Sequence, residues 1–160
     1  MKFGLEPIDL EHEIDHDTIA YDAEGHPVLI VVAKALRDAV ETGTTSTLAA
    51  MTLAGVPFGM YLDPDNLWIF RADSANPREP VLKLRTQEAL SPYSHLLTTQ
   101  KYFFRSLLDR PAEAWLRDIV HGRKHARPPA IDELEAIGLA GRLLGGSTQN
   151  GFYRAYVHLH

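Results

Sequence analysis

Residues 17–34 read Asp-Thr-Ile-Ala-Tyr-Asp-Ala-Glu-Gly-His-Pro-Val-Leu-Ile-Val-Val-Ala-Lys. The pattern predicts two short strands that fold back on each other about Glu24-Gly25. The second strand holds a continuous apolar run at residues 28–33, which is typical of a central strand covered on both faces. This stretch therefore indicates an α/β protein built on a sheet.

The register of this hairpin determines which side chains share a face. A two-residue turn at Glu24-Gly25 places Asp17 opposite Val32 and Asp15 opposite Lys34. Because side chains alternate along strands, all four lie on the same face of the sheet. Two carboxylates and an ammonium are the groups that a metal-assisted phosphodiester hydrolase needs, but Val32 stands where a further ligand is required.

The hairpin resembles the restriction-endonuclease-like fold of the PD-(D/E)XK nucleases. Their signature is an Asp on one strand, a turn, and an acid-x-Lys at the end of the next strand, so Asp17, Val32 and Lys34 take those three places. The resemblance continues through residues 55–71, where two apolar strands flank an Asp-Pro-Asp turn and the second ends in Arg. It covers residues 10–72 and implies an α/β fold with a small mixed sheet of this type flanked by helices, while helical spacing in the remainder indicates a helical C-terminal half.

The substitution at position 32 bears directly on the activity that the resemblance implies. In the family, the two acids hold Mg²⁺ and the lysine stabilises the developing charge. Valine supplies no oxygen ligand, and His16 stands where the family has Pro. A substitute acid could come from Asp15, Glu13 or Glu11, which lie on the first strand or before it, or from another element, because the family sometimes relocates its acid.

Two functions follow from the resemblance. The first is a catalytically degenerate nuclease-like module that acts as a binding or assembly domain in a bacterial multi-protein or defence-type system, without a cofactor or bound metal. The alternative is a divergent magnesium-dependent nuclease, in which Asp17 and Lys34 are catalytic and Asp15 is the relocated acid. Whether the protein is an enzyme stays open, and the loss of the acid favours the first. Lys34 also has a purely structural reading, as a lysine that extends its ammonium to solvent beside Asp15.

The composition limits the classes of partner that are expected. The chain has 160 residues, no cysteine and a formal charge of −5, with a pI of about 5.9. This acidity favours a protein partner or self-association over nucleic acid. There is no apolar stretch of the roughly 18 residues that a membrane span needs, and no signal-peptide pattern, so we expect a cytoplasmic protein without membrane contact.

The chain is expected to form one domain over residues 1–160, with the sheet core at 10–72, a helical portion at 88–146 and a returning strand at 150–160. Helices are expected near Thr44, closed by Gly55, from Pro111 at an early position, and over residues 131–144, and residues 102–108 also have apolar residues at helical spacing.

Residues 121–127 form the densest basic cluster. Arg123, Lys124 and Arg127 are candidates for phosphate contact, although cations at a helix C-terminus also occur for reasons of stability alone. Asp22 is interpreted as a turn residue rather than a metal ligand.

Overall fold

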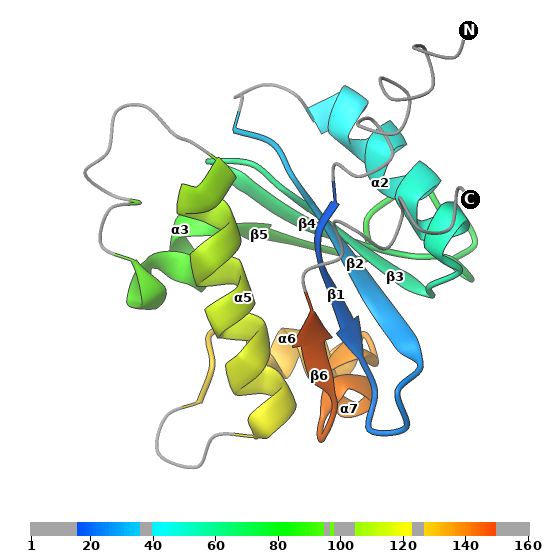
Figure 1. Ribbon diagram of the computed structural model, residues 1–160. Helices are drawn as coiled ribbons and strands as arrows, with labels where there is room; N and C mark the ends of the chain where they lie inside the picture. The colour runs from blue at the N-terminus through cyan, green and yellow to red at the C-terminus, as the bar shows by residue number, and fades with distance from the viewer. Residues whose placement is uncertain (1–15, 36–39, 95–96, 98–104, 123–126, 150–160) are drawn as a thin grey trace, which may run out of the picture.

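The computed structural model describes residues 16–35, 40–94, 97, 105–122 and 127–149 (Figure 1). Within these residues the chain forms a six-stranded mixed sheet in the order β5-β4-β3-β2-β1-β6. The strands are β1 (His16–Tyr21), β2 (Pro27–Ala33), β3 (Phe58–Leu62), β4 (Asn66–Arg71), β5 (Leu82–Arg85) and β6 (Ser147–Gln149). The helices are α2 (Val40–Ala54), α3 (Thr86–Leu90), α5 (Arg105–His121), α6 (Ile131–Ala136) and α7 (Leu139–Leu143), with a 3-10 turn at Ser91–Tyr93. The expected α/β class is therefore confirmed.

The centre of the sheet is the parallel pair of β2 and β3. Helix α2 connects them, and every other neighbouring pair is antiparallel. All five residues of β3 are buried, as are the last six of β2, because helices cover both faces. The apolar run at 28–33 is thus a central strand, as predicted.

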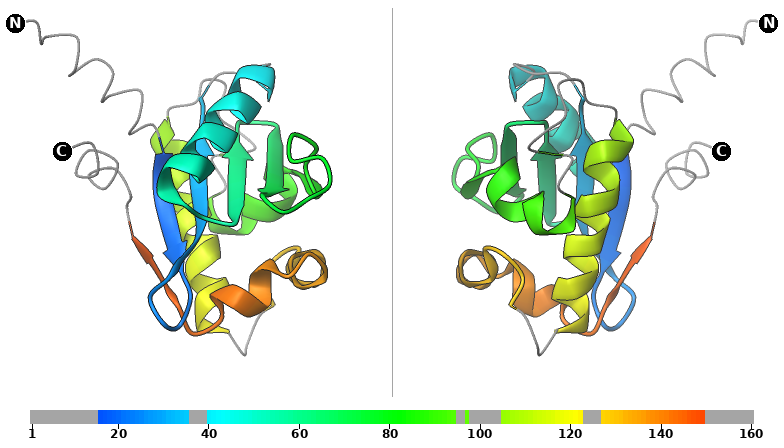
Figure 2. Two further views of the ribbon diagram at one scale, coloured as in Figure 1. Left: turned by 90° about the vertical axis from the view of Figure 1, so that its right-hand side faces the viewer. Right: turned by 90° about the vertical axis from the view of Figure 1, so that its left-hand side faces the viewer.

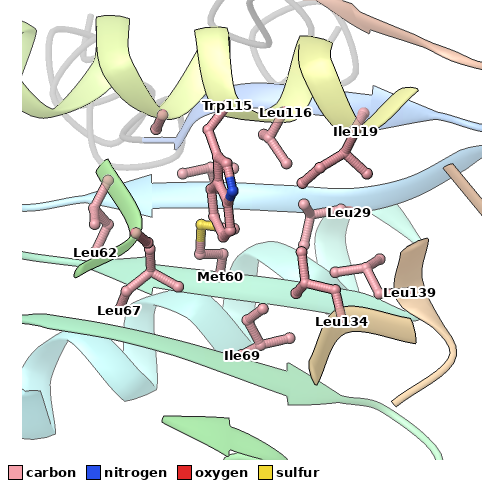
Figure 3. Packing of buried hydrophobic residues seen from close by; sticks show 14 of the residues in the cluster. Leu29, Met60, Leu62, Leu67, Ile69, Trp115, Leu116, Ile119, Leu134 and Leu139 are labelled. Carbon is pink, nitrogen blue, oxygen red and sulfur yellow. The ribbon is translucent and has the colours of Figure 1, made fainter. Parts of the chain in front are cut away.

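The larger core lies between the sheet and α5. Trp115, Leu116 and Ile119 of α5 point onto Leu29, Met60 and Ile69 of the sheet (Figure 3). Leu134 of α6 and Leu139 of α7 join the same cluster. Residues from both halves of the sequence therefore share one hydrophobic core. Burial of such apolar side chains contributes about 1.5–3 kcal/mol each to folding.

Helix α2 packs on the opposite face of the sheet, over β2 and β3 (Figure 2). Two glycines permit the close approach. A Cβ at Gly43 would overlap the ring of Tyr61, and one at Gly59 would overlap the side chain of Met51. This smaller cluster also holds Ile30 and Phe70.

Several expected helix boundaries are wrong. Helix α2 begins at Val40, so Thr44 lies inside it, where packing on the sheet outweighs the capping tendency of a threonine. Helix α5 begins at Arg105 and contains Pro111, because the buried side chains on either side of the proline hold the helix together. Gly55, with φ of +67°, closes α2 as predicted.

The helix expected over residues 131–144 is two short helices, α6 and α7. Gly138 separates them with φ of +86°, a conformation that interrupts a right-handed helix. The C-terminal strand expected at 150–160 lies outside the described residues, whereas β6 immediately before it pairs with β1.

Candidate functional site

The β1–β2 hairpin has the predicted register only in its middle. Thr18, Ile19 and Ala20 pair with residues 31, 30 and 29 of β2, as expected. The register then shifts, and His16 rather than Asp17 lies opposite Val32. The predicted pairing of Asp17 with Val32 is therefore wrong, because an irregularity inserts an extra residue into β1 at this point. Asp15, the predicted neighbour of Lys34, lies outside the described residues.

The turn of this hairpin is also longer than the predicted two residues. The amide of Asp22 donates to the carbonyl of His26, and the amide of Gly25 donates to the carbonyl of Asp22. Gly25 has φ of +87°. The loop therefore has three residues, 23–25, and ends in a glycine in the left-handed region. Gly25 adopts this conformation easily because it has no side chain beyond hydrogen.

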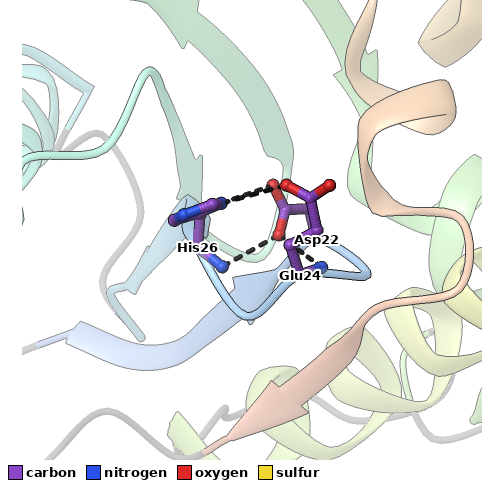
Figure 4. Close-up of polar contacts among 3 residues, drawn as sticks. All are labelled: Asp22, Glu24 and His26. Carbon is purple, nitrogen blue, oxygen red and sulfur yellow. Dashed lines mark hydrogen bonds and ion pairs between the residues drawn. The ribbon is translucent and has the colours of Figure 1, made fainter.

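Asp22 organises this loop. Its Oδ1 accepts hydrogen bonds of 2.9 Å from the amide of Glu24 and 2.8 Å from that of His26 (Figure 4). The bond from the His26 amide, followed by that from Glu24, outweighs partial burial and lowers the pKa of the Asp22 carboxyl. The interpretation of Asp22 as a turn residue is confirmed.

Among the described residues, Asp22, Glu24 and His26 form the one group of three metal-ligating side chains, with ligand atoms within 4.8 Å of one another. They lie at the hairpin tip, at the opposite end of β2 from Lys34. Glu24 and His26 are exposed, and the two hydrogen bonds to Asp22 give this cluster a sufficient structural role. It adds nothing to the predicted hydrolase site.

Val32 is fully buried, at 0% exposure. It pairs in parallel register with Tyr61, on the face that α2 covers. The position to which the resemblance assigns a second acid thus holds a fully buried side chain in register with Tyr61, not an opening to solvent.

Lys34 extends the β2–β3 ladder by one residue, since its amide donates to the carbonyl of Leu62 at 2.8 Å. The register of Ala33 with Leu62 therefore places Lys34 beside Asp63, the residue that directly follows β3. Lys34 is half-buried. The sequence reasoning missed Asp63 as an acid near Lys34, although an Asp directly after an apolar strand was the available signal.

Asp63 is buried, and its carboxylate is fully engaged. Oδ1 accepts the amides of Asp65 and Asn66 at 2.7 and 2.6 Å. Oδ2 accepts the Tyr61 hydroxyl at 2.6 Å and the Asn66 side-chain amide at 3.2 Å. Burial, and then the hydrogen bond to Asp63, raise the pKa of the Tyr61 phenol far above its ordinary value. With about four acceptor positions used, Asp63 holds the β3–β4 turn and leaves no lone pair directed at a hydrated Mg²⁺.

The predicted phosphate-contact cluster is described only in part. Arg123 and Lys124 lie outside the described residues, while Arg127 is exposed and forms an ion pair with Asp132. Arg127 also lines a hollow of about 270 Å³ with Asp118 and Glu135. The acids around Arg127 make it a poor isolated anchor for phosphate.

Comparisons with protein-family models, with curated proteins and with solved structures find no match to this chain. In the described part of the chain, no helix combines the length and the apolar character needed to cross a bilayer.

Proposed function

We propose that this chain is a catalytically degenerate module of the restriction-endonuclease-like type, which acts as a binding or assembly domain rather than as a nuclease. The order of a β-hairpin, a helix and a second β-hairpin agrees with the order expected from the resemblance. The observation that carries the proposal is the complete burial of Val32 beside Tyr61, where a nuclease of this type needs an exposed carboxylate.

The acid nearest in register to Lys34 supports the same conclusion. Asp63 is buried and saturated with hydrogen bonds, so it does not replace the missing ligand. A site that lacks oxygen ligands does not hold Mg²⁺, because this ion demands near-octahedral oxygen coordination. The overall charge of −5 favours a protein partner, or a second copy of the chain, over nucleic acid. A bacterial multi-protein or defence-type system remains the setting that the resemblance suggests.

One observation favours the alternative, a divergent magnesium-dependent nuclease. The irregularity in β1 at Asp17 is of a kind that often re-aims a side chain next to an active site. In that case Asp17, with Asp15 as the relocated acid, would hold the metal. Lys34 would stabilise the charge that develops on the phosphate.

A cleavage assay separates the two functions. Supercoiled plasmid and single-stranded oligonucleotide are incubated with the full chain in Mg²⁺ and in Mn²⁺, alongside Asp17→Asn and Lys34→Ala. Lys83→Ala serves as the matched lysine control, since Lys83 lies on β5, which is three strand positions away from β2 in the sheet. We expect no cleavage by the wild-type chain above that of the two site variants. Cleavage that is lost in Asp17→Asn and Lys34→Ala, but kept in Lys83→Ala, would establish the nuclease instead.

A further inference from the structure

Strand β5 is an edge of the sheet. It pairs with β4 on one side, and among the described residues no strand pairs with its other side (Figure 1). An unpaired edge presents a row of backbone donors and acceptors that can accept a further strand. The opposite edge, β6, is only three residues long and its side chains are uncharged.

The hydrogen-bond pattern identifies which backbone groups of β5 face outward. The amide of Thr86 donates to the carbonyl of Asp65, and hydrogen-bonded pairs alternate along an antiparallel ladder. Leu84 and Leu82 are therefore the residues bonded to β4, opposite Leu67 and Ile69. The amides and carbonyls of Lys83 and Arg85 point away from β4, toward the open edge.

The same two residues supply the charge at this edge. Leu82 and Leu84 are half-buried against the core on the α5 side, whereas Lys83 and Arg85 are exposed on the other face. The Lys83 ammonium lies 4.6 Å from the centroid of the Trp68 ring, a cation–π contact that holds it above the sheet. Two cations at i and i+2 are thus displayed on one face of an edge strand.

We propose that β5 is the docking edge for an extended, acidic segment of a partner protein. The segment would add a strand beside β5, bonding the backbone groups of Lys83 and Arg85, with carboxylates at i and i+2 opposite their side chains. This inference rests on the proposed binding function and names the chemistry of the partner.

A second copy of this chain is a poor occupant. Two β5 strands that pair antiparallel about Leu84 bring Lys83 of one copy against Arg85 of the other, and a parallel pairing also sets cation beside cation. Like charges directly opposite each other destabilise a strand pair. Nucleic acid would contact the two cationic side chains but would leave the outward backbone amides and carbonyls without partners. An acidic strand would pair with both the side chains and these backbone groups.

The test uses a labelled heptapeptide of sequence Thr-Val-Glu-Val-Glu-Val-Thr, with a Lys-for-Glu version and a version N-methylated at both glutamates. Binding to the full chain is measured by fluorescence anisotropy at low and at physiological salt. The protein variants are Lys83→Glu/Arg85→Glu and, as a control with equal change of charge on the helices, Arg110→Glu/Arg142→Glu. Both control positions are exposed. Circular dichroism melts establish that each variant is folded.

We expect the glutamate peptide to bind the wild-type chain and the control variant. We expect Lys83→Glu/Arg85→Glu to weaken that binding by about tenfold or more and to bind the lysine peptide instead. N-methylation should abolish binding. Amide hydrogen exchange gives the decisive readout, because Lys83 and Arg85 should become protected by the peptide while Leu82 and Leu84 change little.

Three results would overturn the inference. Equal binding by the N-methylated peptide would mean charge attraction without strand addition. Tighter binding of a 20-nucleotide oligothymidine, lost in the Lys83/Arg85 variant, would make this a phosphate-binding face. Binding of neither probe would mean that the two cations only protect an edge strand from aggregation. None of these depends on cleavage, so failure here leaves the degenerate-nuclease proposal standing on its own assay.

Discussion

The hydroxyl of Tyr61 donates a 2.6 Å hydrogen bond to Oδ2 of Asp63, and both side chains are fully buried. This bond links the end of the central strand β3 to the turn that follows it. The carbonyl of Asp63 also accepts the Thr86 hydroxyl at 2.7 Å, which attaches the start of α3 to the same turn. The region beside Lys34 is therefore organised by a buried structural carboxylate.

Replacing Tyr61 by Phe tests how much this hydrogen bond contributes to the stability of the protein. The change removes one of the donors to a buried carboxylate, so we expect the free energy of unfolding to fall by about 1–3 kcal/mol. Urea denaturation measures it. Tyr93→Phe is the matched control, because the Tyr93 hydroxyl donates to Asp118 at 2.8 Å in a half-buried setting, and a smaller loss is expected. Equal stability of Tyr61→Phe and wild type would contradict the structural role.

The same residue predicts a dependence on alkaline pH. The folded protein raises the pKa of Tyr61 above its ordinary value of 10.0, so the unfolded chain loses its proton first. The stabilising contribution is therefore complete below about pH 10 and is lost as the pH rises above it. Urea denaturation from pH 8 to 11 should show this decline, and Tyr61→Phe should show less of it. Parallel curves for the two proteins would rule out the assignment.

Replacing Gly43 by alanine should destabilise the protein, although Gly→Ala in a helix usually stabilises it. Alanine is normally preferred in a helix by about 1 kcal/mol. At Gly43 the added Cβ would overlap the Tyr61 ring, so Gly43→Ala should instead destabilise the protein by about 1–3 kcal/mol. Gly141 of α7 is the control, since no heavy atom outside its own helix backbone and chain neighbours lies within 4 Å of a Cβ placed there, so Gly141→Ala should be neutral or stabilising. Thermal melts decide between the two signs.

Val32 offers the most direct test of whether this position can hold a metal ligand. Because the side chain is fully enclosed, Val32→Asp would place a carboxylate in a position with no access to solvent, and we expect a loss of about 3 kcal/mol or more. Val32→Ala, which only leaves a small cavity, should cost less. Both are measured by chemical denaturation. A stable Val32→Asp protein that binds Mn²⁺ in calorimetry would show that this position still accepts a metal ligand.

The central strand and the two hairpins could be predicted because their signals are local. The apolar run at 28–33 and the Asp-Pro-Asp-Asn turn at 63–66 mark a buried strand and a tight turn through the properties of adjacent residues alone. The arrangement of the candidate site was harder to predict. The extra residue at Asp17 and the longer turn at Asp22 changed which side chains face one another, because a slip of one residue moves a side chain to the other face.

By itself, the sequence determined an α/β chain with β2 at its centre and the turns at Gly25 and Gly55, since each of these depends on residue type and short-range spacing. Tertiary structure alone decided that α2 starts at Val40, that α5 continues past Pro111, and that the Asp63 carboxylate is buried with all its acceptor positions used. Those outcomes depend on contacts between residues far apart in the chain, such as Thr86 with Asp63 and Gly43 with Tyr61, and no local pattern records them.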